Sequence, residues 1–369
     1  MMNKNDRKLV FVLNGIYKSR CLKRVEEFID NGYKVDVYGF SWDTDIPNVS
    51  DKFQIEVIGH QSVSFSYFKR LTIIIKSLRN LYKRYRRENV LYYYFFVDVA
   101  LGAFLTSRRP YMYEESDIPY SSMRISMVRN IFKYIDKRII QKSFATVMTS
   151  EGFIDYHFGD SRPSNIILIP NRLNPRIVNY PYKDKEVDIQ ELTIGFVGGV
   201  RYKSIVNFAN TFVKNFPDFS FHVFGDIEPF LKEQCLDLEK NYKNIHFHGV
   251  FKNPEDLPSI YEKIDLVLAT YDYSSVNVRY AEPNKLYEAI YFKTPIIVSR
   301  GTFLSRKVER LGIGYSIDAM DDENIISFVK GLSLSDIQAK KDNCCKFPSD
   351  YTINNNPMLF KYMEQNSIK

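Results

Sequence analysis

Short apolar runs alternate with longer segments of mixed polarity along most of this chain. The longer segments, such as residues 20–32, repeat their apolar positions with a helical period. The short runs are typical of buried β-strands, and they occupy residues 8–13, 34–40, 53–59, 90–96, 111–115, 145–150, 165–170, 192–198, 219–225, 244–250, 265–271, 295–299 and 313–317. Strands that alternate with helices predict an α/β fold in which a parallel sheet is covered on both faces.

A polar stretch at residues 179–191 interrupts this alternation, which then starts afresh. We therefore expect two doubly wound, Rossmann-like domains, an N-terminal one at residues 1–180 and a C-terminal one at residues 190–345. A tail at residues 346–369 is expected to form a helix that returns toward the first domain. Ligands of such sheets bind beyond the carboxyl ends of the strands, so we expect the two domains to face each other across a cleft that holds the site.

The composition is that of an ordinary globular protein with two cores, since 45% of the 369 residues are hydrophobic and 26% are charged. The longest apolar run, residues 91–105, is short for a bilayer span and is interrupted by Asp98. Because no secretory signal pattern opens the sequence, we expect a cytoplasmic protein. The four cysteines have neither metal-site spacing nor the pattern of a disulfide framework, so we expect them to be reduced.

Positive charge is concentrated in the first half of the chain. Residues 1–180 carry a net charge of +10, whereas residues 181–369 carry −3. Residues 69–87 contain eight basic residues and no acidic one, and residues 124–142 contain six basic residues and one acidic residue. Both segments predict helices with mixed basic and aromatic faces.

These basic helices have two candidate partners and one purely structural explanation. Nucleic acid is disfavoured because no RNA- or DNA-binding motif accompanies them. An anionic membrane surface fits better, because basic amphipathic helices bind anionic lipid headgroups. In the first helix Leu78, Leu81, Tyr82 and Tyr85 would then add an apolar contribution. The structural explanation is a solvated basic face on helices that pack against the first sheet.

Residues 279–299 place polar side chains around a proline, ahead of an apolar strand. Pro283 suits the first turn of a helix because proline lacks the N–H that would have no partner there. The sequence therefore predicts a helix that begins at Glu282 or Pro283 and ends near Phe292, with Leu286 on its buried face.

Three polar side chains share the first turns of this predicted helix. Lys285 and the free backbone amides suit a phosphate, while Glu288 suits the two hydroxyls of a ribose, and Asn284 lies beside both. The alternative is a capped amphipathic helix in which Lys285 and Glu288 form a solvated surface pair.

A glycine pair follows the first strand of the second domain. Gly198 and Gly199 would let the backbone approach a ligand closely, and Arg201 or Lys203 would meet its negative charge. Neither the dinucleotide pattern G-x-G-x-x-G nor the P-loop pattern fits this segment. The alternative is a tight turn without a ligand.

With these segments the chain resembles the two-Rossmann (GT-B) glycosyltransferases, most of all glycosyltransferase family 4 and its relatives in bacterial surface-polysaccharide synthesis. The resemblance covers nearly the whole chain, and its specific part is residues 194–318. The segments that carry it are "GFVGGVRYKS", "HVFGD", "HFHGVF", "LPSIYEKIDLVLATY" and "EPNKLYEAIYFKTPIIVS".

The resemblance implies that Arg201 and Lys285 hold the diphosphate of the sugar donor and that Glu288 binds its ribose. The family has two glutamates separated by seven residues, which places the first at Tyr280; Glu282 lies two residues further on. The donor-binding residues that we expect are Gly198, Gly199, Arg201, Lys203, Glu282, Asn284, Lys285, Leu286 and Glu288.

The first domain is the expected acceptor domain. By resemblance Asn14, Gly15 and Arg20 belong to its acceptor-side loop. Glu114 and the three carboxylates Asp98, Glu115 and Asp117 occupy segments that line the cleft of the family, and the last three are our candidates for a catalytic base if the enzyme inverts. Retaining members need no such base, and the alternative for each carboxylate is a helix cap or an exposed loop acid.

We expect a metal-independent hexosyltransferase that transfers a sugar, with retention, from a nucleotide sugar to a lipid-linked glycan at the inner face of the cytoplasmic membrane. No cofactor is expected, and His222, His246 and His248 lack the carboxylates that would complete a metal site. The alternatives are a sugar-nucleotide 2-epimerase of the same fold and a non-catalytic subunit that binds nucleotide sugars.

Overall fold

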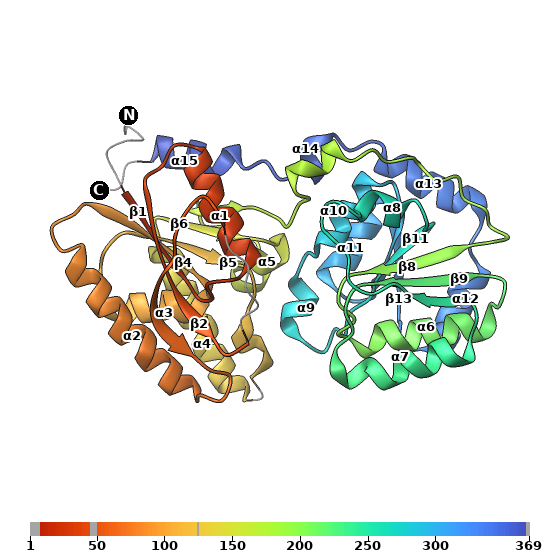
Figure 1. Ribbon diagram of the computed structural model, residues 1–369, viewed down its shortest axis with the longest axis horizontal. Helices are drawn as coiled ribbons and strands as arrows, with labels where there is room; N and C mark the ends of the chain where they lie inside the picture. The colour runs from red at the N-terminus through yellow and green to blue at the C-terminus, as the bar shows by residue number, and fades with distance from the viewer. Residues whose placement is uncertain (1–7, 45–49, 124, 367–369) are drawn as a thin grey trace. The chain divides into compact units, whose positions relative to one another are not determined.

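The computed structural model describes residues 8–44, 50–123 and 125–366. The chain forms two compact units (Figure 1). Unit 1 comprises Met1–Ile169 and Asn356–Lys369, and unit 2 comprises Pro170–Asn355. Residues 170–180, which the sequence assigns to the first domain, therefore lie in unit 2, where the backbone of Leu173 pairs with that of Ile353.

Unit 1 is built on a seven-stranded sheet in which all pairs of neighbouring strands are parallel. The order of its strands is β3-β2-β1-β4-β5-β6-β7. The strands are β1 (Lys8–Leu13), β2 (Val35–Trp42), β3 (Glu56–Gln61), β4 (Val90–Phe95), β5 (Tyr111–Glu115), β6 (Ala145–Met148) and β7 (Ile166–Leu168). Central strands such as β4, with every residue buried, are continuous apolar runs because helices cover both faces.

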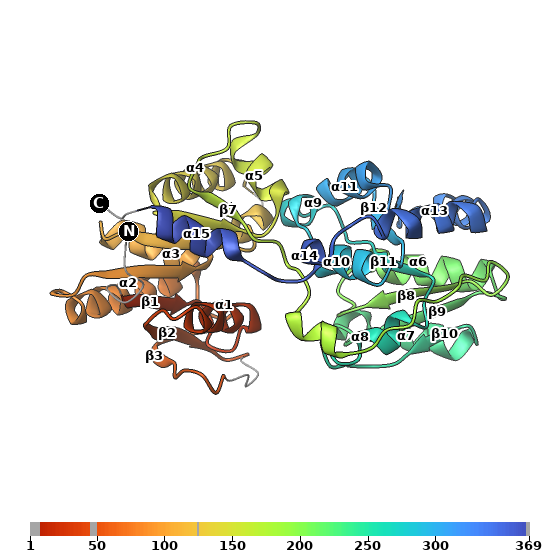
Figure 2. The ribbon, with the colours of Figure 1, turned by 90° about the horizontal axis from the view of Figure 1, so that it is seen from above.

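Helices cover both faces of this sheet (Figure 2). One face packs against α1 (Ser19–Asp30) and α15 (Pro357–Gln365), where Phe28 contacts the rings of Phe11, Tyr93 and Phe360. On the other side lie α2 (Tyr67–Arg84), α3 (Phe96–Thr106) and α4 (Ser126–Lys142), with α2 and α4 each packed against α3. A 3₁₀ helix, η1 (Pro119–Ser122), follows β5, and α5 (Glu151–Phe158) follows β6.

The two predicted basic helices correspond to α2 and α4. In α2 the predicted apolar membrane contribution is wrong for three side chains, because Leu78, Leu81 and Tyr85 are at most 4% exposed and belong to the core of unit 1. Tyr82 is partly buried and shares a hydrogen bond with Tyr94. The solvent-facing side of α2 is thus mainly basic.

Unit 2 is built on a six-stranded parallel sheet with the order β10-β9-β8-β11-β12-β13. Its strands are β8 (Thr193–Val197), β9 (Ser220–Phe224), β10 (Ile245–Phe247), β11 (Leu266–Ala269), β12 (Ile296–Ser299) and β13 (Gly314–Ile317). This is the strand order of the dinucleotide-binding Rossmann fold, and unit 1 has the same order with one further strand. The predicted doubly wound α/β architecture is confirmed in both units.

Two apolar clusters cover the two faces of this second sheet. The first includes side chains of α6 (Lys203–Asn215), α7 (Pro229–Asn241), α12 (Asp322–Lys330) and α13 (Leu334–Cys344). The second includes side chains of η2 (Pro175–Asn179), α8 (Leu257–Tyr261), α10 (Asn284–Tyr291) and α11 (Phe303–Leu311). Two short helices, α9 (Val276–Tyr280) and α14 (Ser349–Thr352), complete the unit.

The chain order reverses between β1 and β4 in unit 1 and between β8 and β11 in unit 2. Loops diverge at such a switch point, and ligands bind there beyond the carboxyl ends of the strands. None of the helices in the described part of the chain has the length and apolar character needed to cross a bilayer.

Candidate functional site

The turn after β8 and the first turn of α10 meet at the switch point of unit 2. The Nζ atom of Lys285 lies 2.9 Å from the position that a Cβ would take at Gly198, whose φ of 136° also disfavours a side chain. Opposite this turn, a Cβ at Gly225 would lie 2.1 Å from the carbonyl oxygen of Gly198. Glycine at these two positions lets the loops after β8 and β9 approach each other and Lys285.

Lys285 is a buried cation with few polar partners. It is 9% exposed, its Nζ donates a hydrogen bond of 3.3 Å to Tyr271 Oη, and it lies 4.5 Å from the ring centre of Phe196. Burial lowers the pKa of Lys285 to about 8, against the opposing effect of the Glu288 charge and with a further lowering by Arg201. A desolvated ammonium of this kind gains from a bound anion.

Glu288 lies one turn further along α10 and is also buried. Its exposed fraction is 5%, and Tyr261 Oη donates a hydrogen bond of 2.9 Å to its Oε2. Burial raises the pKa of Glu288, while Lys285 and the Tyr261 hydroxyl oppose this shift. The alternative of a solvated surface pair is therefore wrong, because Lys285 and Glu288 are both interior.

Glu282 has a different environment from the one we expected. It is 3% exposed, and its Oε2 accepts hydrogen bonds of 2.6 Å from Lys307 Nζ and 2.9 Å from Tyr287 Oη. Lys307 is itself only 7% exposed. This buried ion pair joins the segment before α10 to α11, so Glu282 has a structural partner in place of the expected donor contact.

Arg201 reaches the same region from the loop after β8. It is exposed and forms ion pairs with Asp226, at 3.9 Å, and with Glu228, at 3.4 Å. A Cβ at Gly199 would lie 2.9 Å from Arg201 Nε, so this second glycine makes room for the guanidinium. The structure thus brings Arg201 within electrostatic reach of Lys285, as its effect on the pKa of Lys285 shows.

Three further predicted donor residues lie in different settings. Asn284 is exposed at the first position of α10, which has no side-chain cap, and therefore lies beside free backbone amides. The side chain of Leu286 is fully buried in the apolar core, so the backbone of Leu286 is what the structure leaves for a donor contact. Lys203 opens α6, and its side chain is exposed and lines a pocket formed by α6 and α7.

Sequence reasoning missed the partners that these residues find in the fold. Tyr271 follows β11 and contacts Lys285, and Tyr261 of α8 holds Glu288. Asp272 accepts hydrogen bonds from the backbone N–H groups of Lys203 and Ser204, and so caps α6. Their position in the sequence could have identified Tyr271 and Asp272, because both come just after a buried strand.

The loop after β1 holds the predicted acceptor-side residues of unit 1. Asn14 is 7% exposed, and its Oδ1 accepts a hydrogen bond of 3.0 Å from Lys18 Nζ. A Cβ at Gly15 would lie 2.9 Å from Lys18 Cε. Lys18 also lies 4.3 Å from the ring centre of Phe96, which begins α3 at the carboxyl end of β4.

Asp98 lies in the first turn of α3, on the opposite side of the same switch point. Burial raises the pKa of Asp98, an effect that Arg70, Lys18 and the nearby Tyr67 hydroxyl oppose. Phe96, two residues earlier, has a φ of 66°, which is uncommon for a residue with a side chain and is often found at functional sites. Asp98 is thus a half-buried carboxylate placed where unit 1 would bind a ligand.

Arg20 points to a buried carboxylate instead of a ligand. Its Nε donates a hydrogen bond of 2.9 Å to Glu114 Oε1, and Arg24 Nε donates one of 2.9 Å to Glu114 Oε2. Burial opposes ionisation of Glu114, but the two arginine charges outweigh it and lower the pKa of Glu114 to about 2. This network, to which the Tyr93 hydroxyl also donates, ties α1 to β5.

The two remaining candidate bases, Glu115 and Asp117, differ in solvent exposure. Glu115 is 0% exposed and lies 2.8 Å from His157 Nε2, so it cannot contact an acceptor hydroxyl in this structure and our assignment of it as a base is wrong. Burial raises the pKa of Glu115 well above its ordinary value. Asp117 is exposed in the loop after β5. Asp98 and Asp117 are therefore the accessible members of the predicted set.

Comparison with protein families gives a match over most of unit 2. Residues 183–341 match the family described as glycosyl transferases group 1. No curated protein sequence matches the chain significantly.

Solved structures resemble the whole chain in fold. Sucrose-phosphate synthase from Thermosynechococcus elongatus is 12% identical, with a TM-score of 0.68 over 97% of this chain and 98% of that one. HepE of Anabaena, in complex with UDP and glucose, is 13% identical, with a TM-score of 0.65 over 97% and 99%. WaaG, a glycosyltransferase involved in lipopolysaccharide biosynthesis, is 15% identical, with a TM-score of 0.61 over 93% and 97%.

Proposed function

We propose that the protein is a glycosyltransferase that transfers a hexose from a nucleotide diphosphate sugar to a lipid-linked glycan. Two findings support this proposal: residues 183–341 match the glycosyl transferases group 1, and the whole chain resembles glycosyltransferases in fold. The proposed setting is the synthesis of a surface polysaccharide.

The single observation that carries the donor assignment is the buried ammonium of Lys285 against the Gly198 turn. A diphosphate bound there would receive a charge-assisted hydrogen bond from Lys285, and Arg201 would add a second positive charge. Free amides at the start of α10 favour the same anion. The structure of HepE with UDP supports a nucleotide diphosphate as the ligand.

Glu288 is proposed to bind the ribose hydroxyls of the donor. Its carboxylate is held by Tyr261 and lies in the same helix as Lys285, one turn further from the phosphate position. The HepE complex with UDP-glucose supports a sugar on the diphosphate. Because Lys285 would bind the phosphates and Glu288 the ribose, the two side chains would fix the direction in which the nucleotide lies along α10.

The proposed chemistry is transfer with retention, without a metal ion or an enzyme-derived cofactor. Two cations, Lys285 and Arg201, would stabilise the negative charge that develops on the leaving diphosphate. A retaining reaction needs no protein base for the acceptor hydroxyl. If the reaction inverts instead, Asp98 is the proposed base, since its raised pKa and its position at the switch point of unit 1 suit that task.

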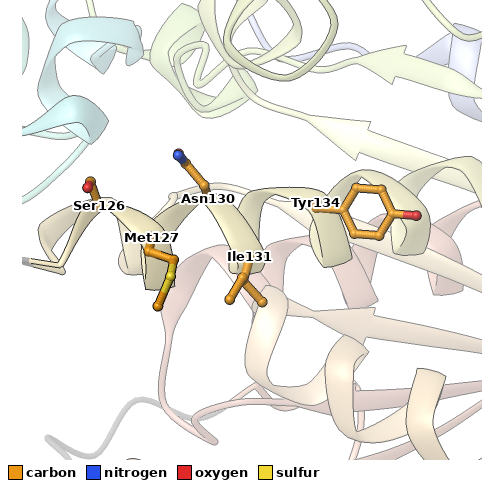
Figure 3. A pocket seen from close by; sticks show the side chains of 5 residues that line it. All are labelled: Ser126, Met127, Asn130, Ile131 and Tyr134. Atoms are coloured by element: carbon orange, nitrogen blue, oxygen red, sulfur yellow. The ribbon is translucent and has the colours of Figure 1, made fainter.

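An exposed face of α4 supports a lipid-bound acceptor. Met127, Ile131 and Tyr134 are 68%, 51% and 60% exposed, and together with Ser126 and Asn130 they line a shallow pocket along the helix. In Figure 3 the side chains of Met127 and Ile131 project to the same side of α4. The helix also carries basic residues and one acidic residue, which is buried. The basic residues are Arg129, Lys133, Lys137, Arg138 and Lys142.

This combination fits the surface of an anionic membrane, where apolar side chains enter the headgroup boundary and cations meet lipid phosphates. The exposed basic side of α2 would contribute mainly charge, together with the exposed ring of Phe68 near its start. We propose that the protein binds peripherally at the inner face of the cytoplasmic membrane. WaaG, which is involved in lipopolysaccharide biosynthesis, supports a membrane-bound glycan as the acceptor class.

A panel of nucleotide sugars tests the donor assignment. A true donor present at about 100 times its dissociation constant should stabilise the fold by about 2.7 kcal/mol, which a thermal-shift assay detects. The donor found in this way is then incubated with membrane extracts, and transfer of a radiolabelled sugar to the lipid fraction is measured. Formation of an epimerised nucleotide sugar without transfer would contradict the proposal.

A further inference from the structure

Three side chains that can bind metals meet in the interior of unit 1. Glu115 ends β5, Asp136 lies within α4, and His157 lies within α5. One ligand atom from each lies within 4.8 Å of the other two. His157 Nε2 is 2.8 Å from Glu115 Oε1 and 3.8 Å from Asp136 Oδ2.

This cluster is buried and short of positive charge. Glu115, Asp136 and His157 are 0%, 1% and 3% exposed. Among the ion pairs of the described residues, neither carboxylate pairs with a lysine or an arginine, and His157 is the basic side chain that contacts both. Lys133 and Lys137 lie near His157 but form no ion pair with the two carboxylates among these residues. Buried carboxylates are normally paired with a cation or coordinate a metal.

The cluster also contains polar atoms without hydrogen-bond partners. Glu115 Oε2, Asp136 Oδ1 and His157 Nδ1 are all buried and unpartnered. The Tyr120 hydroxyl donates a hydrogen bond of 3.0 Å to Asp136 Oδ2. The Tyr113 hydroxyl also lies near Asp136 and helps to lower its pKa, but no hydrogen bond reaches Asp136 Oδ1. Such groups are rare in native interiors and require an explanation, for which an ion is one candidate. Here at least one atom of every member of the cluster is unpartnered.

We propose that Glu115, Asp136 and His157 bind one divalent first-row transition-metal ion, such as Zn²⁺ or Mn²⁺, as a structural site of unit 1. One imidazole and two carboxylates form a ligand set that suits these ions. The charge of +2 would balance the two carboxylates and join β5, α4 and α5. This site is separate from sugar transfer, for which we propose no metal.

The competing explanation is that the two carboxylates share protons instead of a metal ion. Burial, and in each case a neighbouring carboxylate, raise the pKa of Glu115 well above its ordinary value and the pKa of Asp136 to about 7. Neutral carboxyl groups would then satisfy one another in part. Glu115→Gln separates the two explanations, because glutamine imitates a protonated carboxyl group but is a poor metal ligand.

The test is the metal content and thermal stability of the full-length protein. We expect about one transition-metal ion per chain by elemental mass spectrometry after purification without chelators. Removal of the ion with a chelator should lower the Tm by about 5 °C or more, and addition of Zn²⁺ or Mn²⁺ should restore it.

Glu115→Gln is compared with Asp160→Asn, which removes an exposed carboxylate of the same unit. We expect Glu115→Gln to abolish both the bound metal and the metal-dependent increase in Tm, while Asp160→Asn keeps both. The proposal is overturned if the parent binds no metal and gains no stability from Zn²⁺ or Mn²⁺. It is equally overturned if Glu115→Gln retains the metal, because the ion would then reside elsewhere, for example at His222, His246 and His248.

Discussion

The ammonium nitrogen of Lys285 occupies the space next to the α-carbon of Gly198, 2.9 Å from the place where a side chain would begin. The lysine belongs to α10 and the glycine to the turn after β8, so two elements that are distant in the sequence form the proposed anion site. The site needs both partners, since any side chain at Gly198 would displace the cation.

Binding of a nucleotide diphosphate should be linked to protonation of Lys285. The pKa of this group is about 8 in the folded protein against an ordinary value of 10.5, and a bound diphosphate would raise it by favouring the charged form. UDP binding at pH 8.5 should therefore take up protons, and affinity should fall as the pH rises above 8. Calorimetry in two buffers of different ionisation enthalpy measures the uptake, and equal heats in both would contradict this account.

Titration of Lys285 also determines how the free energy of unfolding of the ligand-free protein changes with pH. Between pH 8 and 10.5 the unfolded chain holds a proton on Lys285 that the folded chain has lost. The contribution of Lys285 to the free energy of unfolding should thus increase with pH in this window. Denaturant unfolding of the parent and of Lys285→Met at pH 7.5 and 9.5 isolates this contribution. The free energy of unfolding of the parent should rise relative to that of the variant at the higher pH. An unchanged difference between the two proteins would refute the assignment.

The two glutamates near Pro283 should separate into a functional and a structural residue. Glu288→Gln should reduce donor use strongly, because it removes the charge that is proposed to bind the ribose. Glu282→Gln should lower the free energy of unfolding by about 3–5 kcal/mol, because it leaves Lys307 as a buried cation without its ion pair. Steady-state kinetics and denaturant unfolding of both variants test this division, and the reverse pattern would show that the roles are exchanged.

Arg201 and Lys203 form a matched pair of cations, two residues apart. Arg201→Ala should weaken UDP binding, by less than Lys285→Ala because the exposed guanidinium is solvated and already pairs with Asp226 and Glu228. Lys203→Ala should leave UDP affinity nearly unchanged, since its side chain lines a pocket between α6 and α7. Titration calorimetry measures both, and a larger loss for Lys203→Ala would place the phosphates at the start of α6.

The two basic helices should bind membranes in different ways. Neutralising Lys83, Arg86 and Arg87 at the end of α2 should remove a salt-sensitive part of the binding to anionic vesicles, about 1 kcal/mol for each charge near the surface. Replacing Met127 and Ile131 of α4 with serine should instead remove the part that persists at high salt.

Vesicle co-sedimentation at low and high salt distinguishes these contributions. Nucleotide binding serves as the control, because it should be unchanged in both variants. If both sediment like the parent, the two helices are solvated surfaces and the proposed membrane location loses its support from this chain.

The architecture could be predicted because its signals are local. A strand such as β12 is buried on both faces and therefore reads as a continuous apolar run, and Pro283 marks the start of α10 within one residue. The sequence also proposes Gly198, Arg201, Lys285 and Glu288 for the donor site, because glycine turns and helix starts have recognisable compositions. The structure brings Gly198 and Arg201 close to Lys285, and Glu288 follows Lys285 by one turn of α10.

The pairings of the buried charges could not be predicted in this way. Glu282 meets Lys307, and Glu114 meets Arg24 across 90 positions of sequence, because strand order brings their elements together. Glu115 ends the predicted strand at residues 111–115, two positions before Asp117, yet Glu115 is fully buried whereas Asp117 is exposed. Which of these two acids faces solvent depends on the sheet and its covering helices, and no short segment contains that information.

Titration calorimetry of UDP and GDP against the parent and Lys285→Ala tests the central claim most directly. We expect the variant to lose about 1.5–3 kcal/mol of binding free energy, the range for a charge-assisted hydrogen bond, while its circular dichroism spectrum stays that of the parent. The variant should also lose the proton uptake at pH 8.5. If Lys285→Ala binds both nucleotides as tightly as the parent, the anion site at Gly198 does not hold the donor diphosphate.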